Sequence, residues 1–441
     1  MKSESEFTWS QAKERANQII FQNTGTHLSD LEILILQGAW EKQTYIQIAQ
    51  ENGYSAEYLN KDVGNKMWSK FSTALGEKIT KKNFKEALQR WKEDNNNQFV
   101  SSIVKLPFPE GAVALDSPLY IERENVENLC YQTIENPGSL IRIKAPKLMG
   151  KTSLIMRILA QAKAQNYRTV YLDLSSVNRT VITNLYKFLK WLCLTVGRQL
   201  NLENQLDNYW DTEILGSNDN CTVYFEEYLL TEIDTPLVLC LDAVDRLFPY
   251  TEVIEDFFGM LRFWHERGKI SDVWKRLRLV IAHSTEVYIP LDINQSPFNA
   301  GLPIELSEFN HNQVQRLAQL HGINWNNYLI QELMKIVGGH PYLLRLAMYE
   351  IWSHKITLEQ LLKEAATEAG VYSNHLRRNW ETLQKLPGLT EAFKQVVTSS
   401  EPVELDSKQI YQLHSMGLVK QKDNYVMPQC HLYQDYFRRV L

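Results

Sequence analysis

The segment APKLMGKTS, Ala145 to Ser153, places the strongest constraint on the fold of this chain. An apolar run typical of a strand, SLIRIK, precedes it, and the helical pattern SLIMRILAQAKA begins at its end. Gly-Lys-Thr between a strand and a helix is typical of a Walker A loop, in which backbone N–H groups and the helix amino terminus point at phosphates. The sequence therefore predicts a fold that binds ATP or a similar nucleoside triphosphate.

Each position of this loop has an expected role. We expect Lys151 to reach the β and γ phosphates and Thr152 to place its hydroxyl on Mg²⁺. Gly150 lets the backbone approach the phosphates without a Cβ. Ala145 stands where the pattern has its first glycine, and alanine avoids positive φ. The alternative is a chance Gly-Lys-Thr sequence. The predicted nucleotide-binding residues of the loop are Ala145, Pro146, Lys147, Leu148, Met149, Gly150, Lys151, Thr152 and Ser153.

A second element supports the nucleotide site. The run LVLCLD ends at Asp242, and a buried strand ending in a carboxylate is the Walker B arrangement. We predict that Thr152 and Asp242 hold Mg²⁺, the carboxylate directly or through a water. The next residue is Ala243, whose methyl cannot act as a general base, so hydrolysis is expected to be slow or absent unless Asp245 or another group substitutes. Ala243 fits two explanations: a natural ATPase with weak hydrolysis, or an engineered variant that binds the nucleotide without hydrolysing it.

Other residues are weaker candidates for the same site. Ser284 and Thr285, after the apolar run LRLVIAH, are placed to approach the γ-phosphate, or they cap the next turn. The backbone around Arg123, in YIERENVENL, is expected to lie against the adenine, or the segment is only an amphipathic first helix. In VGGHPYLLRLA, Pro341 is expected to pack on the base and Arg345 to reach phosphate, or the proline only interrupts a helix. The arginine finger is open among Arg246, Arg262, Arg276 and Arg278.

The length of 441 residues predicts about three domains. Unbroken apolar runs at 139–145, 169–174, 237–243 and 277–283 alternate with helical patterns, which predicts a parallel sheet. The polar run DNNNQ, with Pro107 and Pro109 after it, predicts a linker. The predicted organisation is a helical domain at 1–93, a linker at 94–117, a P-loop core at 118–306, a helical lid at 307–360 and a winged-helix-like domain at 361–441.

Composition excludes several classes of protein. The sequence has no run of about 18 apolar residues and no signal-like core after MKSESEF, so we expect a cytoplasmic protein without a membrane span. Its five cysteines never have CxxC spacing, which argues against a zinc ribbon or a disulfide framework. The net charge of -5 predicts no general attraction to nucleic acid.

From about Leu115 to its end, the chain resembles the AAA-like ATPase domains of bacterial signalling and conflict proteins related to the STAND class and to origin-recognition ATPases. The likeness rests on ERENVE at 122–127, KAPKLMGKTSL at 144–154, LDAVDRLF at 241–248, HSTEVYIPLDINQSPFN at 283–299, GGHPYLL at 338–344 and LHSMGLV at 413–419. The resemblance implies ATP or ADP with Mg²⁺, a helical lid and a winged helix. Members usually have Glu at 243, so Ala243 puts turnover in doubt. STAND proteins usually append sensor repeats, which this sequence lacks.

The amino-terminal domain resembles a helix-turn-helix module, with its core at Thr44 to Phe71. Gly53 is expected to form the turn and Ser55 to cap the next helix. The predicted DNA-contacting lysines on that helix are Lys61, Lys66 and Lys70. The alternative is a protein-interaction module that binds an unknown partner through the same residues or through exposed Tyr58 and Trp68.

Three functions remain open from the sequence. The first is a nucleotide-controlled switch that couples ATP binding to assembly, as a homo-oligomer, or to partner binding in bacterial signalling or defence. The second is a DNA-binding regulator or loader whose ATPase governs assembly on DNA. The third is a scaffold with a degenerate nucleotide site. DNA affinity that depends on salt separates the second from the first, and absence of nucleotide binding would favour the third.

Overall fold

The computed structural model describes residues 8–24, 28–90, 106–284 and 299–441. The chain forms two compact units, Met1–Lys105 and Leu106–Leu441, each with its own hydrophobic core. Within the described residues, no helix is both long and apolar enough to cross a membrane.

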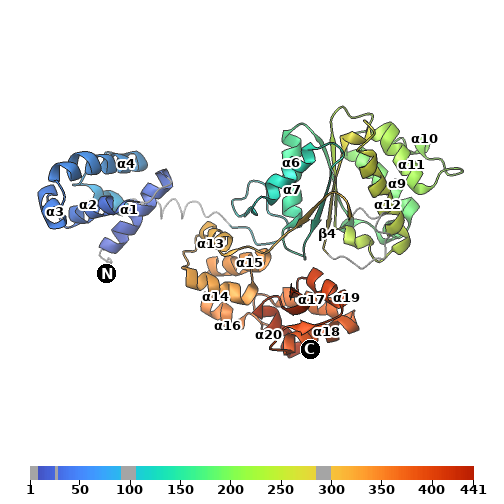
Figure 1. Cartoon of the computed structure of the whole chain (residues 1–441). Coiled ribbons are helices and arrows are strands. Elements are labelled where there is room, and N and C mark those ends of the chain that lie inside the picture. The colour runs from blue at the N-terminus through green and yellow to red at the C-terminus, as the bar shows by residue number, and fades with distance from the viewer. Residues whose placement is uncertain (1–7, 25–27, 91–105, 285–298) are drawn as a thin grey trace. The chain divides into compact units, whose positions relative to one another are not determined.

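The first unit is helical, as predicted (Figure 1). Ser29 and Thr44 each begin a helix with a capping box, because a Glu or Gln three residues later binds the cap backbone N–H. Gly53 ends the third helix in the left-handed conformation with φ 73°, which forms the predicted turn. The elements are α1 (Trp9–Thr24), α2 (Asp30–Trp40), α3 (Tyr45–Asn52), the π-helical segment η1 (Tyr58–Gly64), α4 (Asn65–Leu75) and a helix at 84–90.

The second unit contains the predicted parallel sheet. Its strands are β1 (Leu140–Lys144), β2 (Arg168–Asp173), β3 (Leu237–Asp242), β4 (Leu277–His283) and β5 (Leu302–Glu305). They pair in the order β2-β3-β4-β1-β5, all in parallel. The carboxyl ends of β1 and β3 therefore lie at the same edge of the sheet, with only β4 between them.

Helices cover both faces of this sheet, which explains why β3 and β4 are buried along their whole length (Figure 1). One face packs on α6 (Val126–Glu135) and α7 (Lys151–Ala164), and the other on α9 (Leu185–Gln199), α11 (Ser217–Val223) and α12 (Thr251–Arg267). The shorter core elements are η2 (Leu174–Ser176), α8 (Arg179–Ile182), α10 (Leu206–Tyr209), η3 (Tyr224–Leu229), η4 (Val244–Leu247) and η5 (Trp274–Arg276).

After β5 the chain is mostly helical, and its elements pack around one further hydrophobic core. Four helices come first: α13 (His311–Leu320), α14 (Asn327–Val337), α15 (Pro341–Trp352) and α16 (Leu358–Glu364). The remainder comprises α17 (Ser373–Gln384), α18 (Pro387–Thr398), β6 (Val403–Glu404), α19 (Ser407–Ser415), β7 (Val419–Lys422), β8 (Tyr425–Pro428) and α20 (His431–Val440). Strands β6, β8 and β7 form an antiparallel sheet. The winged-helix assignment of this region stays a prediction.

Part of the predicted linker is bound to the core. The N–H of Val113 donates to Ser153 Oγ at 2.9 Å, and the Arg157 guanidinium donates to the carbonyls of Val113 and Ala114. Ser153 and Arg157 both lie on α7, so this segment packs along the helix that follows the phosphate loop. The linker residues at 94–105 lie outside the described residues.

Candidate nucleotide site

The phosphate loop joins β1 to α7 and has two left-handed residues. Gly150 has φ 97°, and Leu148 has φ 64°. A leucine in this region carries backbone strain of roughly 1–3 kcal/mol, which is typical of functional loops. Ala145 is buried and does not have positive φ, so an alanine fits the position where the Walker A pattern has glycine.

Lys151 is held inside the loop. Its Nζ donates to the carbonyl oxygens of Ala145 at 2.9 Å and Pro146 at 2.8 Å. Only 9% of the residue is exposed, and this burial lowers its pKa to about 8, although the carboxylates of Asp245 and Asp242 act in the opposite direction. The ammonium is therefore already placed among loop carbonyls and largely stripped of water.

Thr152 and Asp242, the two predicted Mg²⁺ ligands, are in direct contact. Thr152 Oγ1 donates to Asp242 Oδ2 at 2.8 Å, and the N–H of Ala243 donates to Oδ1 at 2.8 Å. A hydroxyl and a carboxylate are oxygen donors that suit Mg²⁺. The described residues contain no group of three or more His, Cys, Asp or Glu side chains able to hold a metal. This donor set fits Mg²⁺ in its usual mode, with one or two protein ligands completed by phosphate oxygens and water.

Sequence reasoning missed Tyr171, a residue of β2. Its hydroxyl donates to the same Asp242 Oδ2 at 3.0 Å. Burial, followed by the Asp242 charge, raises the pKa of Tyr171 above its usual value, so the hydroxyl remains a donor. An aromatic residue in an apolar strand is ordinary in a core, and no pattern in the sequence marks this one.

The residues after Asp242 form a tight turn. Ala243 is left-handed with φ 56°, and η4 begins directly after it. Asp245 Oδ1 accepts the backbone N–H of Ser284 at 2.8 Å, which ties this turn to the end of β4. Ser284 therefore contacts Asp245 through its backbone N–H. Asp245 is the residue that could replace the missing general base, and one of its carboxylate oxygens already accepts this hydrogen bond. Thr285 lies outside the described residues.

Arg123 lies three residues before the start of α6 and contacts the phosphate loop. Its guanidinium donates to the carbonyl oxygens of Met149 at 2.6 Å and Ser307 at 3.2 Å. The residue is 5% exposed, and this burial lowers its pKa. Arg123 thus joins the phosphate loop to the segment after β5. Its predicted contact with adenine stays a prediction.

The helical region after β5 meets the loop through His340, one residue before the predicted Pro341. His340 lines the same cavity as Pro146 and Lys147, while Pro341 and Arg345 do not line it. Pro341 is the first residue of α15, where its missing N–H costs nothing. Arg345 is half-buried, and burial lowers its pKa. The contact of Arg345 with phosphate stays a prediction.

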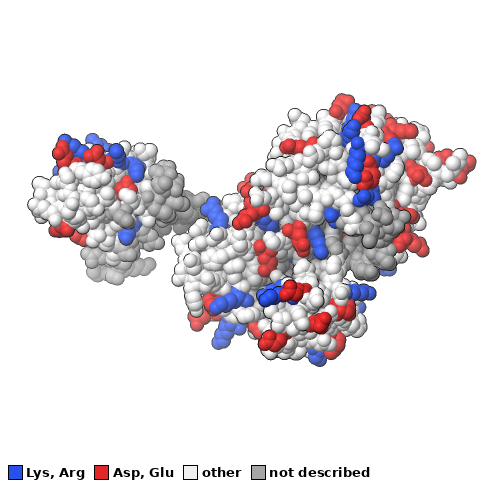
Figure 2. All heavy atoms as spheres, viewed as in Figure 1, with Lys and Arg blue, Asp and Glu red and all other residues white. Residues whose placement is uncertain are grey.

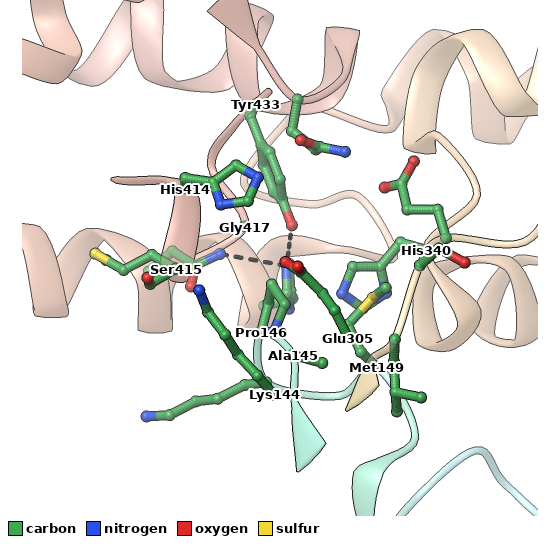
Figure 3. Close-up of a pocket in the computed structure, with 18 residues that line it drawn as sticks. Lys144, Ala145, Pro146, Met149, Glu305, His340, His414, Ser415, Gly417 and Tyr433 are labelled. Atoms are coloured by element: carbon green, nitrogen blue, oxygen red, sulfur yellow. Dashed lines mark hydrogen bonds between the residues drawn. The ribbon is translucent and has the colours of Figure 1, made fainter. Parts of the chain in front are cut away.

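The cavity beside the loop has a volume of about 410 Å³ (Figure 3). Figure 3 shows that its walls come from the loop, the end of β5, His340 and the carboxyl-terminal helices. Within the described part of the chain, the buried His340 Nδ1 and Ser415 Oγ have no hydrogen-bond partner. His375 Nε2 contacts Tyr433 Oη at 2.8 Å. Burial lowers the pKa of His340 to about 3 and that of His375 to about 4, so both rings are neutral at pH 7.

The carboxyl-terminal region also packs directly on the loop. Gly417, in the turn between α19 and β7, has φ 73°, and a Cβ at this position would lie 2.9 Å from Pro146 Cβ and Cγ. Lys144 Nζ lies 5.0 Å from the centre of the Tyr411 ring on α19. A displacement of the loop at Pro146 would therefore push on α19 or on the turn that follows it.

Three of the four arginine-finger candidates have structural partners. Arg276 and Arg278 donate to backbone carbonyls, and Arg262 pairs with Glu266. Arg246 is exposed. It lies in η4, close in sequence to Asp242, and is the candidate that these contacts leave available.

The lysines predicted to contact DNA are partly neutralised. Lys61 pairs with Glu57 at 2.7 Å, and Lys70 pairs with Glu32 at 2.8 Å. Lys66 is exposed. On the face of the first unit shown in Figure 2, basic and acidic side chains are interspersed. Tyr58 is exposed as expected, but the expectation for Trp68 was wrong: it is 8% exposed and packs in the helical core against Phe71 and Phe84.

Sequence comparison defines the class of protein. Residues 108–439, most of the chain, match the AAA-like domain family, and the chain belongs to this family. Residues 7–91 match the family of vWA-MoxR associated protein N-terminal HTH modules, which confirms the predicted helix-turn-helix module.

Individual relatives are distant. An uncharacterized WD repeat-containing protein of Synechocystis is 24% identical over 249 residues, which are 53% of this chain but only 20% of that relative. A Walker-type ATPase of Pyrococcus abyssi matches in structure with a TM-score of 0.50 and 12% identity over 72% of this chain and 96% of its own, which supports the fold alone. The ORC2 protein of Aeropyrum pernix matches with a TM-score of 0.38 and 13% identity over 74% of this chain and 97% of its own.

Proposed function

We propose that this chain is an ATP-binding switch protein in bacterial signalling or defence. Its nucleotide state would set the position of the carboxyl-terminal helices and thereby control assembly or the binding of a partner. The observation that carries this proposal is the contact between Gly417 and Pro146, because it joins the phosphate loop directly to the α19–β7 turn.

The site residues have distinct roles in this proposal. Lys151 would exchange its bonds to the loop carbonyls for bonds to the β and γ phosphates. Thr152 and Asp242 would hold Mg²⁺, which neutralises phosphate charge when bound. The nucleotide would bind along this loop, which contacts the carboxyl-terminal region at Pro146. A complete shift of the switch requires about 5.5 kcal/mol of differential binding between its two states.

Hydrogen exchange on the full chain tests this coupling. Exchange at residues 407–419 should differ between the ADP and the nonhydrolysable ATP-analogue complexes, while residues 145–153 are protected in both. Equal exchange at 407–419 in both complexes would show that the nucleotide does not control this region. Failure to bind any nucleotide would favour a scaffold with a degenerate site.

A glycine pair provides a matched control. Gly417→Ala adds a methyl against Pro146, whereas Gly322 has a similar φ of 72° with nothing within 4 Å of an added Cβ. Both variants carry the strain of a left-handed alanine, about 1 kcal/mol. Only Gly417→Ala should reduce the difference in exchange between ADP and the ATP analogue. An equal effect of Gly322→Ala would indicate backbone strain in place of the loop contact.

We further propose that hydrolysis is weak because residue 243 is alanine. Asp242 is engaged by Thr152, and one oxygen of Asp245 is bound to Ser284 N–H, so no described carboxylate in this turn is left fully available as a base. Ala243→Glu should raise turnover roughly 100-fold, a typical contribution of a positioned general base. Unchanged phosphate release in a steady-state assay would show that residue 243 is not limiting.

The match of residues 7–91 to a helix-turn-helix family favours one alternative function, a DNA-binding regulator or loader. In this alternative the first unit and a winged helix at 361–441 would contact DNA, and ATP would govern assembly of several copies. The paired states of Lys61 and Lys70 argue against strong phosphate contacts by those two side chains. The duplex-binding measurement in the Discussion separates the two functions.

A further inference from the structure

Asp242, the candidate metal carboxylate, accepts two hydroxyl hydrogen bonds at one oxygen. Thr152 Oγ1 lies 2.8 Å from Oδ2, and Tyr171 Oη lies 3.0 Å from the same atom. The other oxygen accepts the N–H of Ala243. The carboxylate is therefore oriented by three donors from β2, β3's end and α7. Of these, Tyr171 has no assigned role.

Tyr171 is itself held in place from outside the sheet. It lies on β2, the edge strand, opposite Cys240 of β3. On the open side of this strand, the Gln199 amide pairs with both backbone groups of Tyr171: Oε1 accepts its N–H at 3.0 Å and Nε2 donates to its carbonyl at 2.9 Å. The side-chain amide takes the place of a neighbouring strand at this one residue, and so fixes the backbone from which the ring reaches Asp242.

We propose that Tyr171 is a positioning residue for the Mg²⁺ site, and this inference rests on the proposed function. When the Thr152 oxygen binds a metal ion, that hydroxyl must serve the ion and Asp242 at once. Tyr171 then holds the carboxylate in its orientation independently of Thr152. This support matters here because residue 243 is alanine and supplies no second carboxylate, while Asp245 is tied to Ser284.

Calorimetry with ADP, in Mg²⁺ and in EDTA, tests the proposal on the full chain. Tyr171→Phe keeps the ring and removes one of the three hydrogen bonds that orient the Asp242 carboxylate. The gain in ADP affinity that Mg²⁺ confers should fall about tenfold, while the affinity in EDTA stays within about twofold of wild type. Tyr186→Phe, which changes an exposed tyrosine on α9, should leave both values unchanged.

Gln199→Met provides a second variant that does not touch Asp242. It removes both backbone bonds to Tyr171 and should also reduce the Mg²⁺-dependent gain, by a smaller factor. An unchanged gain in Tyr171→Phe overturns the proposal. So does an equal loss in Mg²⁺ and in EDTA, which indicates general damage to the loop. If wild type binds no ADP under either condition, the proposed function itself fails, and that result is distinct from both.

Discussion

The lysine of the phosphate loop differs sharply from two lysines of the helical first unit. In the first unit, the side chains of Lys61 and Lys70 are 68% and 40% exposed and pair with glutamates. In the second unit, Lys151 is 9% exposed, donates to two loop carbonyls, and has a pKa lowered to about 8 by burial. A desolvated ammonium binds an anion strongly because it has little water to lose, whereas a solvated ion pair contributes little. A lysine-rich segment is therefore weaker grounds for anion binding than a single lysine in a phosphate loop.

The largest expected effect comes from removing the buried ammonium. Lys151→Met should weaken ATP binding about 100-fold or more, because two charge-assisted bonds to phosphate disappear. Calorimetry measures the change. Lys163→Met, an exposed lysine in the last turn of α7, is the matched control and should bind as wild type does. Near wild-type affinity in Lys151→Met would remove the distinction between the two kinds of lysine.

The pKa of Lys151 predicts a pH dependence of smaller size. Phosphate binding requires the ammonium, so ATP affinity should fall up to tenfold between pH 8 and pH 9 as the free protein loses this proton. Calorimetry in buffers of different ionisation enthalpy should show proton uptake on binding near pH 9 and almost none at pH 7. Any ATP binding that remains in Lys151→Arg should not depend on pH in this range.

The stability of the nucleotide-free protein should change in the opposite direction. The folded pKa of Lys151, about 8, lies below its ordinary value of 10.5, so the unfolded chain binds more protons between these pH values. The contribution of Lys151 to the unfolding free energy therefore rises with pH through this window. For the binding prediction above, an ATP affinity that stays constant up to pH 10 would show that Lys151 is not desolvated.

In the first unit, an ion pair with a buried partner should have a modest effect on stability. Glu32 is 6% exposed and accepts Lys70 Nζ at 2.8 Å. Lys70→Met should reduce local stability by about 1 kcal/mol, since the carboxylate keeps only its bonds to Ser29. Hydrogen exchange in α2 and α4 of the full chain measures this. Lys66→Met is the control for an exposed lysine, and equal effects of the two variants would contradict a special role of the pair.

The smallest expected effect concerns DNA. Changing Lys61, Lys66 and Lys70 together to Glu should alter the affinity of the full chain for duplex DNA less than about threefold at low salt, because two of the three lysines are already paired. Fluorescence anisotropy at two salt concentrations checks this. A wild-type affinity that falls steeply with salt and is lost in the triple variant would establish the DNA-binding alternative. It would also show that surface lysines in the first unit act together.

Much of the fold follows from local patterns. The four apolar runs predicted as strands correspond to β1, β2, β3 and β4, because strands buried on both faces need continuous apolar sequence. Short β5 was not predicted, since Leu302–Glu305 has too few residues to show a pattern. Thr152 follows β1 and Asp242 ends β3, and the carboxyl ends of parallel strands in one sheet lie at the same edge, which explains why the two residues meet. The turn at Gly53 was predictable from its glycine.

By itself, the sequence determined the phosphate loop, the carboxylate at the end of β3, the parallel sheet and the helix-turn-helix module, because each depends on residue types at close spacing. The tertiary structure alone decided which distant residues join them. Tyr171 reaches Asp242, Gly417 meets Pro146, and Arg123 meets Met149 only because the sheet order and the later helices bring these segments together. Likewise, the burial of Trp68 and the pairing of Lys70 depend on contacts between helices that no local pattern encodes. Solvation decides what a side chain can do, and solvation is a property of the packed chain.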